Sequence, residues 1–206
     1  MQAFSIVTGP AAPLFVSNVD TDTIIGHEAM SSSPEELAPY AFGALRYLPD
    51  GTANPGFVLN QPKYRAAPIM LAGPNFGCGS SRERAVWALV GIGIRCIVAP
   101  SFGGIFLANC YQNGLLPVIL PEANVRELAL QADADASFKV DLAAKTLSTS
   151  FGSAFAFEVD EMRRQSLLQG LDAIDMTLAD AACIEAWQTE DRAARPWVWQ
   201  QPSARG

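Results

Sequence analysis

The chain has 206 residues, and its 14 Lys and Arg against 21 Asp and Glu leave a net charge of −7. With 17% charged and 50% apolar residues it can bury a large core, which excludes a disordered chain and indicates that a partner covers part of its surface. Basic residues are scattered, which argues against nucleic-acid binding, and the longest apolar run is about half of the ~20 residues that span a bilayer.

The first quarter of the chain is predicted to consist of strands and loops. Short apolar runs at 4–7 and 23–25 are separated by Gly, Pro and polar residues. Residues of about 27–62 are rich in Ser, Pro, Asn and Gly. We therefore expect a long loop there, with one helix near 34–45.

The centre of the chain alternates between short apolar runs, typical of buried strands, and runs with helical spacing. We expect strands at 68–73, 95–99 and 115–120, and helices at 81–91, at 103–113 and from Pro121 onward. This β-α-β-α-β order predicts a parallel sheet with right-handed crossovers.

The last third of the chain has a different pattern. Segments 138–142 and 146–149 predict a hairpin, 155–159 a further strand, and about 160–169 and 177–190 two helices. Trp197 and Trp199 in the tail are expected to pack rather than to bind a ligand. The whole chain predicts an α/β fold in one domain, with a parallel β-α-β centre of three strands, β-rich flanks and C-terminal helices.

The cysteines and the single histidine limit the metal chemistry of the chain. Cys78, Cys96, Cys110 and Cys183 include no Cys-x-x-Cys pair, and His27 stands alone. The sequence therefore predicts no metal site, and it predicts free thiols in a reducing, cytoplasmic compartment. The N-terminus lacks a cationic stretch, so we expect no signal peptide.

A glycine-rich turn at 73–83 carries the clearest chemical signal. It lies between a predicted strand and a predicted helix, and Gly77 and Gly79 permit positive φ and a close approach of the backbone to a ligand. Ser80 or Ser81 would lie at the helix N-terminus, where unpaired N–H groups favour an anion such as a carboxylate or phosphate. Arg82 fits bidentate capture of a carboxylate.

Three other interpretations of this turn compete with an anion site. A dinucleotide-binding fingerprint fails because Arg82 occupies the position of the third glycine, and a phosphate loop of Walker type fails for lack of Gly-Lys-Ser/Thr. Ser80-x-x-Glu83 also matches a capping box, which would only start the helix. Spacing alone leaves the cap and the anion site open.

With these residues in view, the chain resembles the small subunit of 3-isopropylmalate dehydratase (isopropylmalate isomerase), a family of the aconitase swivel-domain superfamily. The most specific match is Gly77-Cys-Gly-Ser-Ser-Arg-Glu83. The matching segments follow in order over most of the chain: 18–25, 57–62, 75–83, 97–102, 113–119 and 167–174.

The resemblance implies a swivelling β/β/α domain over residues 1–206, with a long loop at about 27–62 and a C-terminal helical extension at about 160–206. It implies a heteromeric hydro-lyase of leucine biosynthesis, which interconverts 2- and 3-isopropylmalate by dehydration and rehydration. This chain would bind no cofactor, and it would be active only with a large subunit that holds a [4Fe–4S] cluster. The cluster iron would act as a Lewis acid on the departing hydroxyl.

The resemblance also implies roles for three consecutive residues. Ser80 would be the general base, acting as an alkoxide on the carbon-bound proton next to a carboxylate. Ser81 would help to bind the substrate by hydrogen bonding, and Arg82 would bind a substrate carboxylate. Because a serine hydroxyl is a very weak acid, the alkoxide needs nearby N–H groups and cations.

Further residues are expected around the active-site mouth. Asp20 and Asp22 would orient the loop together with Gly77 and Gly79, although Asp-Thr pairs also form turns by bonding from the side chain to the backbone. His27 would contact a substrate carboxylate, or else it is a surface residue of a loop.

The chain departs from the family pattern in the loop 26–36, where Gly26-His27-Glu28-Ala29-Met30 replaces Pro-Lys and an aromatic-leucine pair. In addition, Arg84 stands where a histidine often follows the Glu. These departures motivate an alternative, the same chemistry on another 2-hydroxy di- or tricarboxylic acid, such as a methylated malate or an aconitase-like substrate. A third hypothesis is a non-catalytic module that binds a carboxylate or a protein.

Overall fold

The structure is a computed structural model that describes residues 1–29 and 32–199. The chain divides into two compact units, residues 1–170 and residues 171–206. Met30 and Ser31, part of the loop 26–36, lie outside the described residues. The interpretation of the chain as a single domain stays a prediction.

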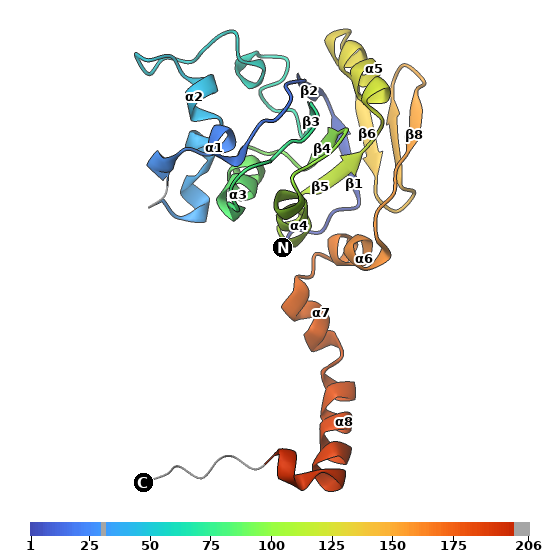
Figure 1. The fold of residues 1–206 in the computed structure, drawn as a ribbon. Helices are drawn as coiled ribbons and strands as arrows, with labels where there is room; N and C mark the ends of the chain where they lie inside the picture. The colour runs from blue at the N-terminus through green and yellow to red at the C-terminus, as the bar shows by residue number, and fades with distance from the viewer. Residues whose placement is uncertain (30–31, 200–206) are drawn as a thin grey trace. The chain divides into compact units, whose positions relative to one another are not determined.

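A four-stranded parallel sheet forms the centre of the first unit (Figure 1). Its strands are β2 (Ala11–Leu14), β3 (Ile69–Ala72), β4 (Cys96–Ala99) and β5 (Leu116–Ile119), in that order. The parallel centre is confirmed, but the prediction of three strands is wrong. Pro13 hides β2 in the sequence, and it is tolerated because β2 is an edge strand and needs fewer backbone N–H donors.

Side chains alternate between the two faces of this sheet along each strand, and both faces are buried because other elements cover each of them. Met70, Ala72, Ile97 and Ala99 pack on the side of α3 (Glu83–Gly91) and α4 (Gly104–Gln112). On the opposite side, Ile69, Leu71, Cys96 and Val98 pack with residues of α5 (Glu122–Asp133) and of a second sheet. The helices lie close to their predicted positions.

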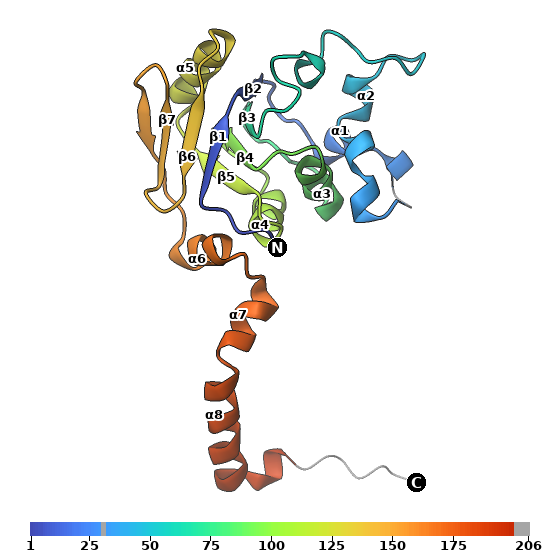
Figure 2. The same cartoon turned by 180° about the vertical axis from the view of Figure 1, so that it is seen from behind.

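The second sheet is antiparallel and joins the two ends of the first unit (Figure 2). It contains β1 (Ile6–Gly9), β6 (Phe138–Asp141), β7 (Thr146–Thr149) and β8 (Ala154–Ala156), in the order β1-β6-β7-β8. The predicted hairpin is confirmed, and the last strand is shorter than expected. The helix α6 (Glu161–Gln169) follows and ends at Gly170, which has a φ of +71°.

Two expectations for the first quarter are wrong. The run 23–25 lies at the end of a short helix, α1 (Thr21–Ile24), because the Asp20 carboxylate accepts a hydrogen bond from Thr23 N at 2.7 Å and caps it. The helix near 34–45 is replaced by short turns, since Pro39 lacks the N–H that a continuous helix needs. The short helical segments described in the long loop are η1 (His27–Ala29), η2 (Pro34–Glu36), η3 (Ala38–Tyr40), α2 (Gly43–Arg46) and η4 (Val58–Asn60).

The described part of the second unit, residues 171–199, is mainly helical, but the prediction of a single helix at 177–190 is wrong. Two helices, α7 (Ala173–Ala179) and α8 (Ala181–Ala194), are followed by the turn η5 (Pro196–Val198). Trp199 packs as expected and donates to Asp191 at 2.8 Å, whereas Trp197 is 66% exposed. In the described parts of the chain, no helix combines the length and the apolar character that a membrane span requires.

Candidate active site

The glycine-rich loop lies at the carboxyl ends of three neighbouring parallel strands. Segments 18–21, 73–82 and 101–103 follow β2, β3 and β4 in turn, and loops that leave the same edge of a parallel sheet lie side by side. Backbone hydrogen bonds join them: Gly77 N to Val19 O at 2.7 Å, Thr21 N to Cys78 O at 3.0 Å, and Gly103 N to Phe76 O at 2.9 Å. The loop is therefore held from both sides.

Gly77 and Gly79 have the positive φ that the sequence predicts, +71° and +87°. A Cβ on Gly77 would lie 2.2 Å from the Phe106 ring, whose side chain fills the core beneath the loop. A Cβ on Gly79 would lie 3.4 Å from the Asp20 Cβ. Gly77 thus meets two constraints at once, a left-handed backbone and direct contact with the core.

Ser80 is exposed, and a hydrogen bond from a buried residue holds its backbone in place. Thr21, only 1% exposed, donates its hydroxyl to the Ser80 carbonyl at 2.8 Å. A hollow of about 180 Å³ lies beside Ser80. Its lining comes from the glycine loop and from the start of α4: Gly77, Cys78, Gly79, Ser80, Gly103, Gly104, Ile105 and Phe106. The serine hydroxyl is thus placed on an open surface by a rigid support.

The capping-box interpretation is wrong. Helix α3 begins at Glu83 with Arg82 as its N-cap, and within the described residues no side chain supplies a cap hydrogen bond there. The Glu83 carboxylate instead accepts a hydrogen bond from Asn113 Nδ2 at 2.9 Å, and Asn113 Oδ1 accepts one from Trp87 at 2.8 Å. Ser80 lies outside the helix and does not cap it.

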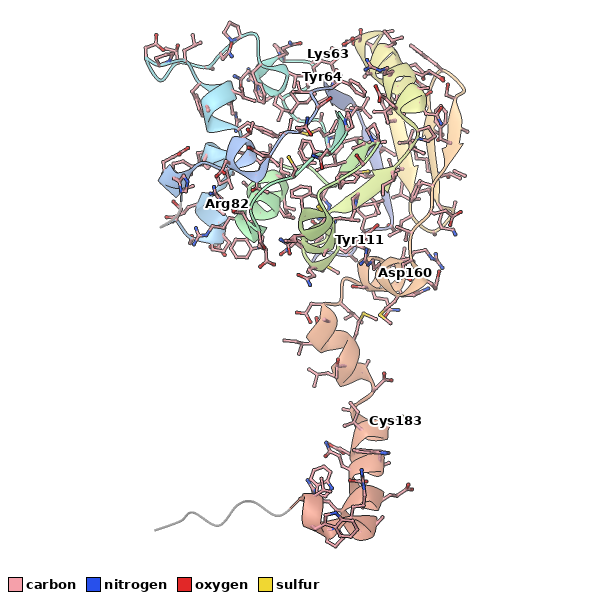
Figure 3. All side chains as sticks on the ribbon, viewed as in Figure 1. Lys63, Tyr64, Arg82, Tyr111, Asp160 and Cys183 are labelled. Carbon is pink, nitrogen blue, oxygen red and sulfur yellow. The ribbon has the colours of Figure 1, made fainter. Side chains whose placement is uncertain are left out.

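Arg82, which is labelled in Figure 3, lies at the start of α3. Its guanidinium contacts the side chains of Asp22 and His27. The Arg82 guanidinium forms an ion pair with Asp22, donates to the Ile25 carbonyl at 3.3 Å, and lies 3.5 Å from Nε2 of His27. Since a guanidinium can only donate, Nε2 can take part only as an acceptor, with the ring proton on Nδ1. The Arg82 side chain is 14% exposed.

Asp20 has a structural role at the beginning of α1. The hydrogen bonds from the side chain and the backbone of Thr23 lower the pKa of its carboxyl, and the charge of Arg82 adds to this effect. This is the turn-forming alternative expected for an Asp-Thr pair. Asp20 therefore remains an anion and is unsuited to donate a proton.

Three residues of the site were missed by sequence reasoning: Thr21, Arg84 and Asn113. Arg84 donates to the carbonyls of Ala29 and Ser32 at 3.0 and 2.7 Å, so the first turn of α3 holds the loop that departs from the family pattern. The sequence marks Arg84 as a departure from the family pattern but gives no sign of its two carbonyl partners, which lie 55 and 52 residues away.

The donor set of this chain does not fit an iron–sulfur cluster. Within the described residues, no group of three or more His, Cys, Asp or Glu side chains could hold a metal ion. Burial raises the pKa of the Cys96 and Cys110 thiols, which keeps them protonated, whereas cluster ligands are thiolates. Cys78 is partly exposed and Cys183 exposed.

Comparison with known proteins defines the class first. Residues 1–123 match the family model of the aconitase C-terminal domain, so the chain belongs to that family. A crystal structure of 3-isopropylmalate dehydratase from Methanocaldococcus jannaschii is similar with a TM-score of 0.64 and 25% identity, and the match covers 89% of this chain and 99% of that one. The predicted α/β fold of the swivel type is confirmed.

Curated relatives define the family more narrowly. The 3-isopropylmalate dehydratase small subunit of Cereibacter sphaeroides (strain ATCC 17029 / ATH 2.4.9) is 48% identical over 201 residues, which cover 96% of this chain and 100% of the relative. That of Rhodospirillum centenum is 46% identical over 96% of this chain and 99% of its own. The chain therefore belongs to the 3-isopropylmalate dehydratase small-subunit family.

The Gly77→Ala substitution is expected to destabilise the first unit by at least about 2 kcal/mol, because the added Cβ meets Phe106 and the backbone is left-handed. Chemical denaturation of the purified chain measures this loss. Gly104→Ala is the matched control, since its Cβ would have nothing within 4 Å. Equal stability of the two variants would contradict the constraint on Gly77.

The Arg84→Met substitution is expected to release the loop without unfolding the sheet, because two carbonyls lose a charged donor. Hydrogen exchange should become faster by about tenfold or more in the segment around Ala29 and Ser32 and stay slow in β3 and β4. Arg126→Met, which removes a surface ion pair with Glu122, serves as the control and should leave this segment unchanged. Unaltered exchange near Ala29 in R84M would show that the hydrogen bonds from Arg84 to the two carbonyls do not hold the loop in place.

Proposed function

We propose that this chain is the small subunit of a heteromeric hydro-lyase that interconverts 2- and 3-isopropylmalate by dehydration and rehydration in leucine biosynthesis. The observation that carries this proposal is the 48% identity to a protein of that name over nearly the whole of both chains. These relatives are named for isopropylmalate, so they do not favour the alternative of another hydroxy acid.

Ser80 is the proposed general base. Its alkoxide takes the proton from the carbon next to a carboxylate and becomes a hydroxyl, while hydroxide leaves the neighbouring carbon and a double bond forms. In the second step, the serine proton is transferred to the carbon that lost the hydroxide, and hydroxide adds to the carbon that lost the proton. Support comes from the exposed position of Ser80, its buried anchor Thr21 and the positive field of Arg82 and the N-terminus of α3.

Substrate binding is proposed for Arg82, Ser81 and His27. The guanidinium of Arg82 provides a charged fork for a carboxylate, and His27 lies next to it. Ser81 is exposed between Ser80 and Arg82, where its hydroxyl can donate to the same carboxylate.

The proposed loop-orienting residues are Asp20, Asp22, Gly77 and Gly79. Asp20 caps α1, whose residue Thr21 anchors Ser80, while Asp22 pairs with Arg82. The two glycines give the loop its shape.

The site is proposed to be completed by a large subunit in the cytoplasm. The hollow beside Ser80, about 180 Å³, is smaller than the roughly 300–1,000 Å³ of typical ligand pockets. Ile105 at its edge is 55% exposed, an apolar contact that a partner surface would cover. On this proposal, the [4Fe–4S] cluster belongs to the large subunit, because the thiols of this chain are unsuited to hold it.

Reconstitution tests the proposed function. Mixed with its cognate large subunit under conditions that preserve iron–sulfur clusters, the chain is expected to convert 3-isopropylmalate to 2-isopropylmalate, and either subunit alone should be inactive. Chromatographic separation of the two isomers measures the reaction. Conversion of another alkylmalate, with none of isopropylmalate, would refute the proposal.

The Ser80→Ala substitution is expected to lower kcat of the reconstituted enzyme by about 10³-fold or more, since an essential proton acceptor is removed. Ser148→Ala, on the antiparallel sheet, is the matched control and should keep full activity. Size-exclusion chromatography with the large subunit checks that both variants still assemble. A fully active S80A complex would exclude Ser80 as the base.

A further inference from the structure

The Arg82 guanidinium already holds a carboxylate in this structure. Its Nη1 forms an ion pair with Asp22 and also donates to the Ile25 carbonyl, while Nη2 faces His27. Among the described residues, Asp22 is the one carboxylate within ion-pair distance of Arg82. An incoming substrate carboxylate therefore meets a guanidinium that is partly occupied.

The three contacts of Arg82 differ in how easily they can be given up. The Ile25 carbonyl belongs to a residue that is 2% exposed and paired in a β-bridge with Ala41, so it is fixed. His27 is exposed, and its Nε2 lies 3.5 Å from Nη2 of Arg82, the longest of the three contacts. The Asp22 side chain is 48% exposed and can rotate into water without moving the backbone of α1. Asp22 is thus the contact that can be exchanged.

Electrostatics favours an exchange over a shared site. The substrate is a dianion, and two carboxylates on one guanidinium repel each other at short distance. The Arg82 side chain is only 14% exposed, so removing Asp22 without a replacement leaves a charge that water solvates poorly. A substrate carboxylate supplies the replacement at the moment when Asp22 leaves.

We propose that Asp22 is a stand-in for a substrate carboxylate: it holds the Arg82 side chain oriented in the free enzyme and is displaced when the substrate binds. This inference rests on the proposed function of Arg82 as a carboxylate-binding residue. Asp22 thereby weakens ground-state binding, because every substrate molecule has to compete with it, and the orientation of Arg82 is kept between turnovers.

The Asp22→Asn substitution in the reconstituted complex distinguishes two cases. Either the substrate displaces Asp22 from Arg82, or Asp22 stays bound to Arg82 throughout. Asparagine keeps the size and one oxygen of the side chain but carries no charge. Loss of the competing carboxylate is expected to lower two constants by about two- to fivefold: the KM for 3-isopropylmalate and the Kd of 2-isopropylsuccinate, which calorimetry measures. This range corresponds to the free energy of a half-exposed ion pair. Isopropylsuccinate keeps both carboxylates but lacks the hydroxyl that is eliminated.

Two further variants control the measurement. Asp22→Glu restores a carboxylate and should return both constants toward their wild-type values. Glu122→Gln removes the carboxylate from another arginine pair, Glu122–Arg126 on the surface of α5, and should leave both constants unchanged. Far-UV circular dichroism and thermal unfolding check that D22N remains folded.

Each outcome decides the proposal. Weaker binding of isopropylsuccinate to D22N would show that Asp22 has to stay on Arg82, and equal binding would show that the two carboxylates do not compete; both overturn the proposal. Calorimetry does not depend on turnover. A wild-type complex that binds isopropylsuccinate without converting isopropylmalate would refute the proposed function, while the comparison with D22N still tests Asp22.

Discussion

The site depends on one constraint, the parallel pairing of the loop after β3 with the chain that follows β2 and β4. The bridges Asp20–Cys78 and Phe76–Phe102 continue the strand order of the sheet beyond its edge. Each joins residues far apart in the sequence, and closing such loops costs conformational entropy. Burial of the parallel sheet offsets this entropy cost, since its strands already hold the three segments next to each other. The Ser80 backbone therefore has a fixed position although its side chain faces solvent.

Much of the fold could be predicted from the sequence, and the errors have local physical causes. Apolar runs of strand length located β3, β4 and β5, and the hairpin of β6 and β7 followed from alternation. By contrast, β2 was missed because a proline is compatible with an edge strand as well as with a loop. The β-branched run 23–25 favours a strand by composition, but the Asp20 cap starts a helix two residues earlier.

The site was predictable where its chemistry lies in one continuous segment. Gly77, Gly79, Ser80 and Arg82 are close in sequence, so their spacing showed a loop suited to an anion. Thr21 and Arg84 could not be found in this way, because their hydrogen-bond partners are distant in sequence. The partner of Thr21 lies 59 residues away, and the two partners of Arg84 lie 55 and 52 residues away. The capping box failed for the same reason, since a partner 30 residues distant, Asn113, takes the Glu83 carboxylate.

The position of Arg82 shows why net charge was a poor guide to the substrate. A cation at the N-terminus of a helix is unfavourable in the field of the helix dipole, and stability alone gives no reason to place one there. The Asp22 carboxylate compensates for this cation by an ion pair, and the N–H groups of the first turn of α3 add to the same positive field. A chain with a net charge of −7 thus places a cation and a helix N-terminus together, at the point where we propose that a substrate carboxylate binds. Repulsion from the rest of the chain is screened over about 8–10 Å, so the electrostatic field around Arg82 depends on this local arrangement more than on the net charge.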